Sequence, residues 1–324
     1  AAIADKDIIG VIGPLYSGAT KATLPHLIGA GLVAISPAAS NYSLTNQQSS
    51  SSGYPVFQRV IGVNFGAPLA KHSIKGVTSP KVYLVDALEN YSGAQTNAVK
   101  ETLTTLNASV AGTQDVSGEL TDFTPLLAKI KSTGANVIIY LGYDSGAAVF
   151  VKQIRDAGLT ATFAAGGVSF GKDFSKLAGK AAEGARVTTN ALGSISQISP
   201  TLEADFKKVT GFNSDTYSLE AIDATNIMLS CIGKGNVTRA TLLKCVREFK
   251  GKSILGAEIS FDSNGDISGN HTYVGEVKNS LIQFTDPITN EPVIQKPADT
   301  SDARIDLLSI SARTISPGEK VTWN

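Results

Sequence analysis

Two loops rich in small hydroxyl residues carry the most informative chemistry of the sequence. Ser17 and Thr20 follow Gly13-Pro14 at the expected start of a helix, and residues 36–40 (Ser-Pro-Ala-Ala-Ser) follow the next apolar run. The free N–H groups and the dipole of a helix N-terminus favour an anion such as a carboxylate. Helix capping explains either loop alone, but two such loops after neighbouring strands favour a carboxylate pocket.

Two tyrosines offer apolar contacts to the same ligand. Tyr91 and Tyr143 each follow an expected strand farther along the chain. A tyrosine in such a loop is often only a surface residue. Two that face the serine loops would instead provide large contacts with a polar tip.

The sequence around one serine matches a motif that carries the nucleophile in hydrolases. Residues 167–171 read Gly-Val-Ser-Phe-Gly, which matches the nucleophile-elbow pattern around Ser169. A triad also needs a later acid and a histidine, and His271 is the only histidine downstream. A glycine-rich loop between a strand and a helix explains the pattern as well. The same stretch resembles a phosphate-binding loop, but Asp173 occupies the position where that motif requires Ser or Thr.

The sequence offers no convincing metal site. Residues 262–266 resemble a calcium loop in composition, but the acidic spacing is wrong and no Glu closes the loop. The three histidines are far apart, and there is no Cys-x-x-Cys. We therefore expect no metal and no cofactor, and interpret residues 262–266 as a turn before a hairpin.

The two cysteines are a candidate disulfide. Cys231 lies at the end of one expected helix and Cys245 lies within the next. A bridge would close a loop of 15 residues and add about 3 kcal/mol of stability. An exported protein would oxidise the pair, whereas a cytosolic protein would keep two buried thiols.

Composition sets broad limits on the function. The chain has 324 residues, of which 42% are hydrophobic, and its 28 basic and 28 acidic residues give a formal net charge of zero. This length suits two domains, and a neutral chain gives no reason to expect binding to nucleic acid or to anionic membranes. No apolar run is long enough to predict a membrane-spanning helix.

The elements that position the loops alternate between buried strands and amphipathic helices. This pattern is typical of parallel sheets covered on both faces, whose binding sites lie beyond the carboxyl ends of the strands. Residues 1–6 read as the end of a helix, and the last part of the chain changes to a hairpin around Asn279. The expected strands cover residues 7–13, 32–35, 56–60, 81–86, 136–142, 162–165, 186–189, 272–277 and 281–284, and the expected helices cover 20–30, 91–106, 145–157, 217–232, 238–249 and a segment starting near 122.

An ordered series of short motifs resembles the leucine/isoleucine/valine-binding proteins, the amino-acid branch of the type I periplasmic binding proteins that serve ABC importers. No single motif is decisive, but all of them occur in the family's order over residues 1 to about 284. The motifs are Val11-Ile12-Gly13-Pro14 with Ser17, Ile35-Ser36-Pro37-Ala38-Ala39-Ser40, Asn90-Tyr91-Ser92-Gly93, Thr121-Asp122-Phe123 with Leu126, Tyr140-Leu141-Gly142-Tyr143, Ala181-Ala182-Glu183-Gly184, and Phe261-Asp262 with Gly265-Asp266.

The resemblance implies an α/β fold with two Rossmann-like lobes, parallel sheets flanked by helices, and a hinge of three crossovers. Lobe one would comprise residues 1–61 plus 190–273, and lobe two residues 62–189 plus 274–284. Residues 285–324 would form a linker and a β-like tail.

The resemblance also implies roles at the site. Ser17 and Ser40 would donate to the ligand carboxylate, and the Ala38 carbonyl would accept from an ammonium group. Tyr91 and Tyr143 would close over the ligand from lobe two.

Two departures from the family pattern matter for the ligand. Where the family has a Glu that pairs with the ligand ammonium, this chain has Gly167, or Gly166 on a slightly shifted match. Since a buried ammonium without a carboxylate is costly, either Asp144, Glu220 or Asp86 substitutes, or the ligand lacks the amine. The family's opening strand–helix–strand is also missing, so we expect a fragment or a lobe completed by another chain or by the tail.

These expectations combine into one function. The chain is expected to be a non-enzymatic solute-binding protein, periplasmic or attached to the outer cell surface, with any membrane anchor outside this sequence. It would bind a small carboxylate, such as a branched-chain or other amino acid or a related organic acid, and pass it to ABC permease subunits. The alternatives are a ligand-sensing domain of a larger receptor and a hydrolase using Ser169.

Overall fold

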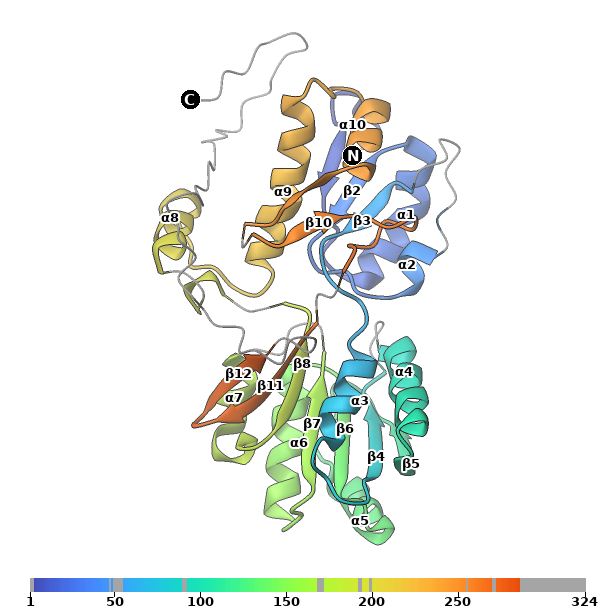
Figure 1. Cartoon of the computed structure of the whole chain (residues 1–324), viewed down its shortest axis with the longest axis vertical. Helices are drawn as coiled ribbons and strands as arrows, with labels where there is room; N and C mark the ends of the chain where they lie inside the picture. Colours follow the sequence, from blue (N-terminus) through green and yellow to red (C-terminus); the bar gives the residue numbers. More distant parts are fainter. Residues whose placement is uncertain are drawn as a thin grey trace.

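The chain folds into two lobes that lie one above the other (Figure 1). The computed structural model describes residues 3–46, 48, 55–88, 92–167, 172–191, 194–197, 200–254, 256–269 and 272–285. Lobe one contains a three-stranded sheet, and lobe two contains a seven-stranded sheet. Helices flank both sheets, so the predicted α/β class with parallel sheets is confirmed.

The sheet of lobe one is parallel and has the order β1-β2-β3, formed by β1 (Gly10–Ile12), β2 (Val33–Ser36) and β3 (Phe57–Arg59). A separate antiparallel pair, β9 (Lys250–Lys252) and β10 (Glu258–Ser260), lies in the same lobe. Every residue of β2 is buried, because β2 is the central strand and helices cover it. The helices of this lobe are α1 (Ser17–Ala30), α2 (Ser43–Asn46), α9 (Ser218–Gly233) and α10 (Arg239–Arg247), and α8 (Pro200–Thr210) lies to one side.

The sheet of lobe two has the order β12-β11-β8-β7-β6-β4-β5. Its five strands from β5 to β8 run parallel, and the hairpin of β11 and β12 extends the sheet in antiparallel fashion. The strands are β4 (Lys81–Asp86), β5 (Ser109–Asp115), β6 (Val137–Leu141), β7 (Thr162–Gly166), β8 (Arg186–Thr189), β11 (Tyr273–Lys278) and β12 (Leu281–Thr285). The helices are α3 (Gly66–Ile74), α4 (Ser92–Thr105), α5 (Thr124–Thr133), α6 (Asp144–Asp156) and α7 (Lys172–Ala178).

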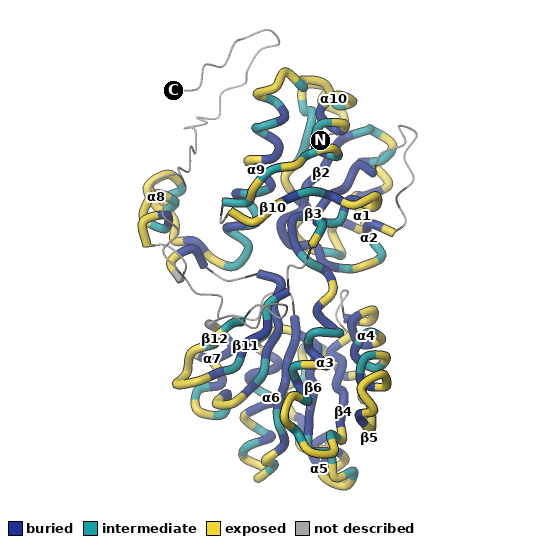
Figure 2. The backbone as a smooth tube through the Cα atoms, viewed as in Figure 1, coloured by how far each residue is buried: buried dark blue, intermediate teal, exposed yellow. Residues whose placement is uncertain are grey.

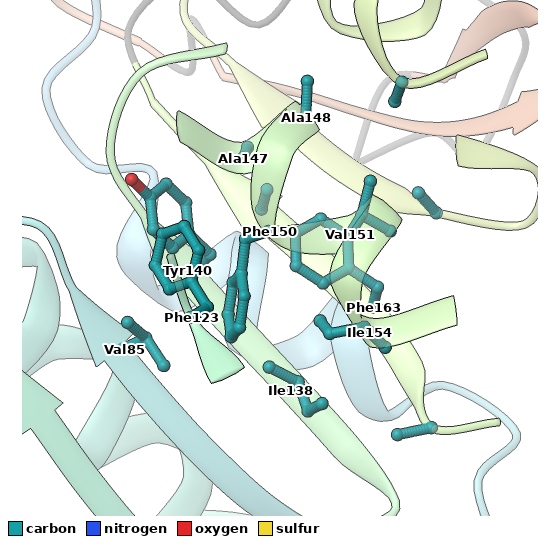
Figure 3. Close-up of a cluster of buried hydrophobic side chains, with 14 of the residues drawn as sticks. Val85, Phe123, Ile138, Tyr140, Ala147, Ala148, Phe150, Val151, Ile154 and Phe163 are labelled. Carbon is teal, nitrogen blue, oxygen red and sulfur yellow. The ribbon is translucent and has the colours of Figure 1, made fainter. Parts of the chain in front are cut away.

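Strand β6 shows why this sheet is covered on both faces. All five of its residues are buried, and successive side chains of a strand point to opposite faces. Ile138 and Tyr140 pack into one core, in which Phe123 and Phe150 stack at a ring-centroid distance of 4.4 Å (Figure 3). The alternate residues of β6 pack into a second core under α3 and α4. Figure 2 shows the result, with buried strands at the centre and exposed outer faces on the helices.

The chain passes between the lobes three times, after β3, after β8 and between β10 and β11 (Figure 1). Side chains tie these three crossovers together. The Thr272 hydroxyl donates to the Asn64 carbonyl at 3.1 Å and to Asn190 Oδ1 at 2.9 Å. The Asn190 amide in turn donates to the Gly62 carbonyl.

The sequence predicted most of these elements, with a few errors. The strands at 81–86 and 186–189 match β4 and β8, and the predicted hairpin is present with Asn279 and Ser280 at positive φ in its turn. Residues 3–7 are turn and bend rather than the end of a helix, held by the Arg239 guanidinium, which donates to the carbonyls of Ile3 and Asp5. Strands β5, β9 and β10 and helices α2, α3, α7 and α8 were not predicted. Helices α3 and α8 carry Gly or Pro in their first turns, where these helix breakers are tolerated. The predicted tail lies outside the described residues, except Thr285, which ends β12.

The predicted disulfide is present and joins the two helices that cover the sheet of lobe one. Cys231 in α9 and Cys245 in α10 are bonded, with their Cα atoms 5.8 Å apart. Cys231 is fully buried, and both residues pack in the core of lobe one. The bridge therefore fixes two elements that together cover one face of β1 and β2.

Removing this bridge should lower the stability of the chain. We expect Cys231→Ala with Cys245→Ala to lower the free energy of unfolding by about 3 kcal/mol, because the unfolded chain regains the entropy of the closed loop. Urea denaturation of the oxidised wild type and the double variant measures this difference. Wild type treated with a reductant is the control and should resemble the variant; equal midpoints for all three samples would contradict the prediction.

Candidate ligand-binding site

The carboxyl ends of the parallel strands in the two lobes face each other. Strand β3 ends where the chain leaves lobe one, and β8 ends where it leaves lobe two. Since β1 and β2 are parallel to β3, and β4, β6 and β7 are parallel to β8, the loops after all these strands lie on the edges nearest the other lobe. Parallel sheets place their binding sites at these edges.

The two serine loops of lobe one are hydrogen-bonded to each other. Ser36 Oγ donates to the Pro14 carbonyl at 2.6 Å, and Ser17 Oγ accepts from the Asn41 N–H at 3.0 Å. Ser36 Oγ also accepts from the Ala39 N–H at 2.9 Å, which curls the second loop. The structure therefore brings Ser17, Ala38 and Ser40 together at one edge, as their order after neighbouring strands predicts.

The start of α1 is suited to an anion. Tyr16 is its N-cap, yet no side chain caps the helix and no acidic residue lies in its first turn. The Ser17 hydroxyl holds the neighbouring loop instead of capping its own helix. The alternative of simple helix capping by Ser17 is therefore wrong, and the first-turn N–H groups keep their affinity for negative charge.

Lobe two places its predicted residues at the opposite edge. Tyr143 follows β6 as the N-cap of α6 and is 46% exposed, and Gly167 follows the adjacent strand β7. Leu88 follows β4 on the other side of β6 and is 63% exposed. Tyr91, and also Ser169 and His271 of the hydrolase alternative, lie outside the described residues.

Exposed apolar side chains gather at both edges. Lobe one contributes Leu15, Tyr16 and Tyr42 from the loops after β1 and β2, and lobe two contributes Leu88 and Tyr143. The sequence analysis assigned no ligand contact to Tyr16 or Leu88. The sequence did contain a signal for such contacts, namely an aromatic or apolar residue in a loop that directly follows a strand.

Three carboxylates were considered as substitutes for the missing Glu, and Asp86 is already engaged. Its Oδ1 accepts from the Leu88 N–H at 2.9 Å and from Ser92 Oγ at 2.6 Å, and its Oδ2 accepts from the Thr96 hydroxyl. Asp86 therefore fixes the start of α4. Asp144, the first residue of α6, lies next to Tyr143 at the edge of lobe two.

Glu220 lies in the first turn of α9 in lobe one, next to Asp223. Burial raises the pKa of Glu220 to about 8, and the nearby Asp223 carboxyl adds to this effect. Burial also raises the pKa of Asp223 to about 7, although its Oδ1 accepts from the Ile254 N–H at 2.7 Å. Burial therefore favours the neutral form of Glu220 at neutral pH in the absence of a nearby positive charge.

Of the two glycines matched to the family's Glu, Gly166 lies against other side chains. A Cβ atom on Gly166 would lie 2.5 Å from Leu69 Cδ2 and 2.8 Å from Thr188 Oγ1, so a side chain there would displace its neighbours. The site thus has no carboxylate at Gly166.

Across the described ranges, no helix is long and apolar enough to cross a membrane. In the same part of the chain, no three His, Cys, Asp or Glu residues are grouped so that they could hold a metal ion.

Comparison with known proteins identifies related chains. The sequence profile of the periplasmic binding protein family matches residues 1–280. The Leu/Ile/Val-binding protein homolog 1 of Brucella melitensis is 27% identical over 263 residues, which cover 79% of this chain and 68% of the relative.

Two solved structures share the fold. A leucine-binding protein from Thermotoga maritima has a TM-score of 0.72 at 22% identity, covering 88% of this chain and 81% of its own. A solute-binding protein of an ABC transporter from R. palustris, solved in complex with 4-hydroxybenzoate, has a TM-score of 0.70 at 21% identity, covering 90% of this chain and 79% of its own.

The raised pKa of Glu220 predicts a stability that falls with pH. Between pH 5 and pH 8 the unfolded chain releases the Glu220 proton while the folded chain retains it, so the free energy of unfolding decreases as pH rises. Glu220→Gln should remove the part of this decrease that comes from Glu220, roughly 3 kcal/mol between pH 5 and pH 8. Asp223, whose pKa burial raises to about 7, should account for the decrease that remains. Urea denaturation at pH 5 and pH 8 measures the effect.

Asp122→Asn is the control, because hydrogen bonds from Thr124 lower the pKa of the exposed Asp122 carboxyl. Its removal should leave the decrease at high pH in place. A Glu220→Gln variant with the same pH dependence as wild type would show that Glu220 is not buried as a neutral acid.

Proposed function

Because the chain belongs to the type I periplasmic binding protein family, in the branch of the Leu/Ile/Val-binding proteins, we propose that it is the solute-binding protein of an ABC importer. It binds a small carboxylate between its two lobes and delivers the ligand to permease subunits. It acts by binding and catalyses no reaction.

The observation that carries this proposal is that groups suited to a carboxylate and exposed apolar side chains both lie at the facing edges of the lobes. Lobe one offers the uncapped start of α1 and the hydroxyl-rich loop with Ser40, which suit a carboxylate. Both lobes also leave large apolar side chains exposed there, among them Tyr16 and Tyr143. A ligand with a carboxylate at one end and an apolar body satisfies both surfaces, since binding sites combine apolar walls with a few placed polar groups.

Closure of the lobes follows from the three crossovers. We take residues 1–61 plus 190–273 as lobe one and residues 62–189 plus 274–284 as lobe two. The hydrogen bonds of Asn190 and Thr272 hold the crossovers together as one hinge. Rotation about this hinge brings Tyr143 and Gly167 over a ligand held by Ser17, Ala38 and Ser40.

The ligand class is narrowed by the charges near the site. The family's Glu is absent, Asp86 is engaged by the start of α4, and burial favours the neutral form of Glu220, so negative charge to pair with an ammonium is scarce near the site. Relatives are named for leucine binding or were solved with 4-hydroxybenzoate. We propose a small carboxylate with an apolar or aromatic body and without an amine.

The proposed location is outside the cytoplasm. The disulfide between Cys231 and Cys245 supports it, because such bonds persist in oxidising compartments. The importer's permease is the proposed protein partner.

Matched pairs of ligands test the proposal. Leucine and 4-methylpentanoate share one skeleton and differ in the amine, and 4-hydroxybenzoate adds an aromatic acid. At about 100 times its dissociation constant, a true ligand should add roughly 2.7 kcal/mol to the free energy of unfolding, which a thermal-shift assay followed by calorimetry detects. We expect the two amine-free acids to bind more tightly than leucine. If leucine binds more tightly than the acids and Asp144→Asn loses this binding, Asp144 is the residue that pairs with the leucine ammonium. If none of the three ligands binds, the proposed function is refuted.

Tyr143 should contribute directly to affinity. We expect Tyr143→Ala to weaken binding of the preferred acid about ten-fold, because the variant lacks the exposed aromatic ring that would contact the ligand. Phe212→Ala is the matched control, since Phe212 is 75% exposed and belongs to none of the loops that follow the parallel strands. Calorimetric titration should show no change for Phe212→Ala; equal affinities of both variants would remove Tyr143 from the site.

A further inference from the structure

Arg59 is a fully buried cation at the last position of β3, where the chain leaves lobe one. Its side chain is 0% exposed, and its only ion pair in the described residues is with Asp266, which is 13% exposed. Arginine is almost never fully buried unless it is paired, and a buried pair adds little net stability over apolar residues. The cost of burying this charge therefore calls for a role beyond stability.

The guanidinium binds the loop that carries Ser40. Nη1 donates to the Ala39 carbonyl at 3.0 Å and to the Asn41 carbonyl at 2.8 Å, on either side of Ser40. Nη2 donates to Thr45 Oγ1 at 2.8 Å, just beyond the same loop. One side chain thus fixes the loop at three points.

These bonds set the direction of the Ser40 N–H. The peptide bond between Ala39 and Ser40 is trans, so its N–H points opposite to its carbonyl. Since the Ala39 carbonyl faces Arg59, the Ser40 N–H faces away from the guanidinium. The following N–H, of Asn41, is directed to Ser17 Oγ. The loop is held in one shape in which the Ser40 N–H is turned out of the Arg59 cluster.

The other side of Arg59 reaches the third crossover. Nε donates to Asp266 Oδ1 at 2.5 Å, and the Arg59 N–H donates to the Gly265 carbonyl at 3.1 Å. Asp266 Oδ2 accepts from Thr45 Oγ1 at 3.0 Å, which closes a ring of hydrogen bonds. Gly265 makes this approach possible, because a Cβ atom there would lie 2.3 Å from the Phe57 carbonyl oxygen. Arg59 begins the first crossover and Asp266 leads into the third, so the cluster joins the loop to two parts of the hinge.

We propose that Arg59 is a positioning residue of the ligand site, which, with Asp266 as its counter-ion, holds the Ala39–Asn41 loop so that Ser40 presents its N–H to the ligand carboxylate. This inference rests on the proposed function for the presence of that carboxylate. The same contacts link occupation of the loop to the crossovers about which the lobes close.

Arg59→Lys is the decisive variant, because lysine keeps the charge beside Asp266 but lacks the planar fork that reaches both carbonyls. Arg155→Lys is the matched control. Arg155 Nη1 also donates to two carbonyls, those of Leu159 and Ala161, but it does so before β7, at the far edge of lobe two. Both variants lose hydrogen bonds to two carbonyls, and Arg59→Lys also loses the bond to Thr45. Only Arg59→Lys loses these bonds at the proposed site.

Two measurements are made at a temperature at which circular dichroism shows each variant fully folded. Calorimetry with 4-methylpentanoate and 4-hydroxybenzoate should show a dissociation constant at least about ten-fold higher for Arg59→Lys and unchanged for Arg155→Lys. Hydrogen exchange without ligand should be faster over residues 37–42 in Arg59→Lys only. Thr45→Val, which removes one link of the ring, should show a smaller loss of affinity in the same direction and serves where Arg59→Lys folds poorly.

A purely structural role would lower the melting temperature of Arg59→Lys and leave the dissociation constant of the folded protein as in wild type, which would overturn the proposal. Unchanged exchange over residues 37–42 would also overturn it. If wild type binds neither acid, the proposed function is refuted, while faster exchange over residues 37–42 would still support Arg59 as the group that fixes the loop.

Discussion

The positions of the loops in this structure depend on the direction of two strands, β3 and β8, each of which ends at the edge of its sheet nearest the other lobe. Strands β3 and β8 both run toward the connection between the lobes, and the strands parallel to them end on the same edges. Parallel hydrogen bonding thus brings loops from distant parts of the sequence onto two facing edges. The residues of the proposed site follow from this constraint, because each of them lies in a loop after the carboxyl end of a strand or at the start of the next helix.

Polar and apolar groups at these edges are distributed in an unusual way. Two buried charged groups are hydrogen-bonded within the protein: Arg59 by two carbonyls, Thr45 and Asp266, and Asp86 by the start of α4. The exposed side chains, in contrast, are large and apolar. Exposed apolar side chains of this kind favour a binding partner that covers them. A ligand bound between the lobes would cover them.

The charges are the reason for proposing a ligand class narrower than that of the family as a whole. Lobe one offers a helix N-terminus and the N–H groups of a loop braced by a buried arginine, all of which favour an anion. Opposite charge for a cationic group is scarce, because burial favours the neutral form of Glu220 and Asp86 is used to hold α4. The arrangement therefore favours ligands with a single negative end.

The sequence by itself determined the alternation of strands and helices, the parallel sheets and the loops in which the site lies. These depend on local patterns, such as the apolar run of β6, the turn at Asn279 and Ser280, and the hydroxyl residues after β1 and β2. The tertiary structure alone decided which groups are free to act. Ser17 holds a neighbouring loop rather than its own helix, Asp86 is engaged by α4, and Arg59 finds its counter-ion 207 residues away. Burial and long-range hydrogen bonds arise only when distant segments meet, so no local pattern contains them.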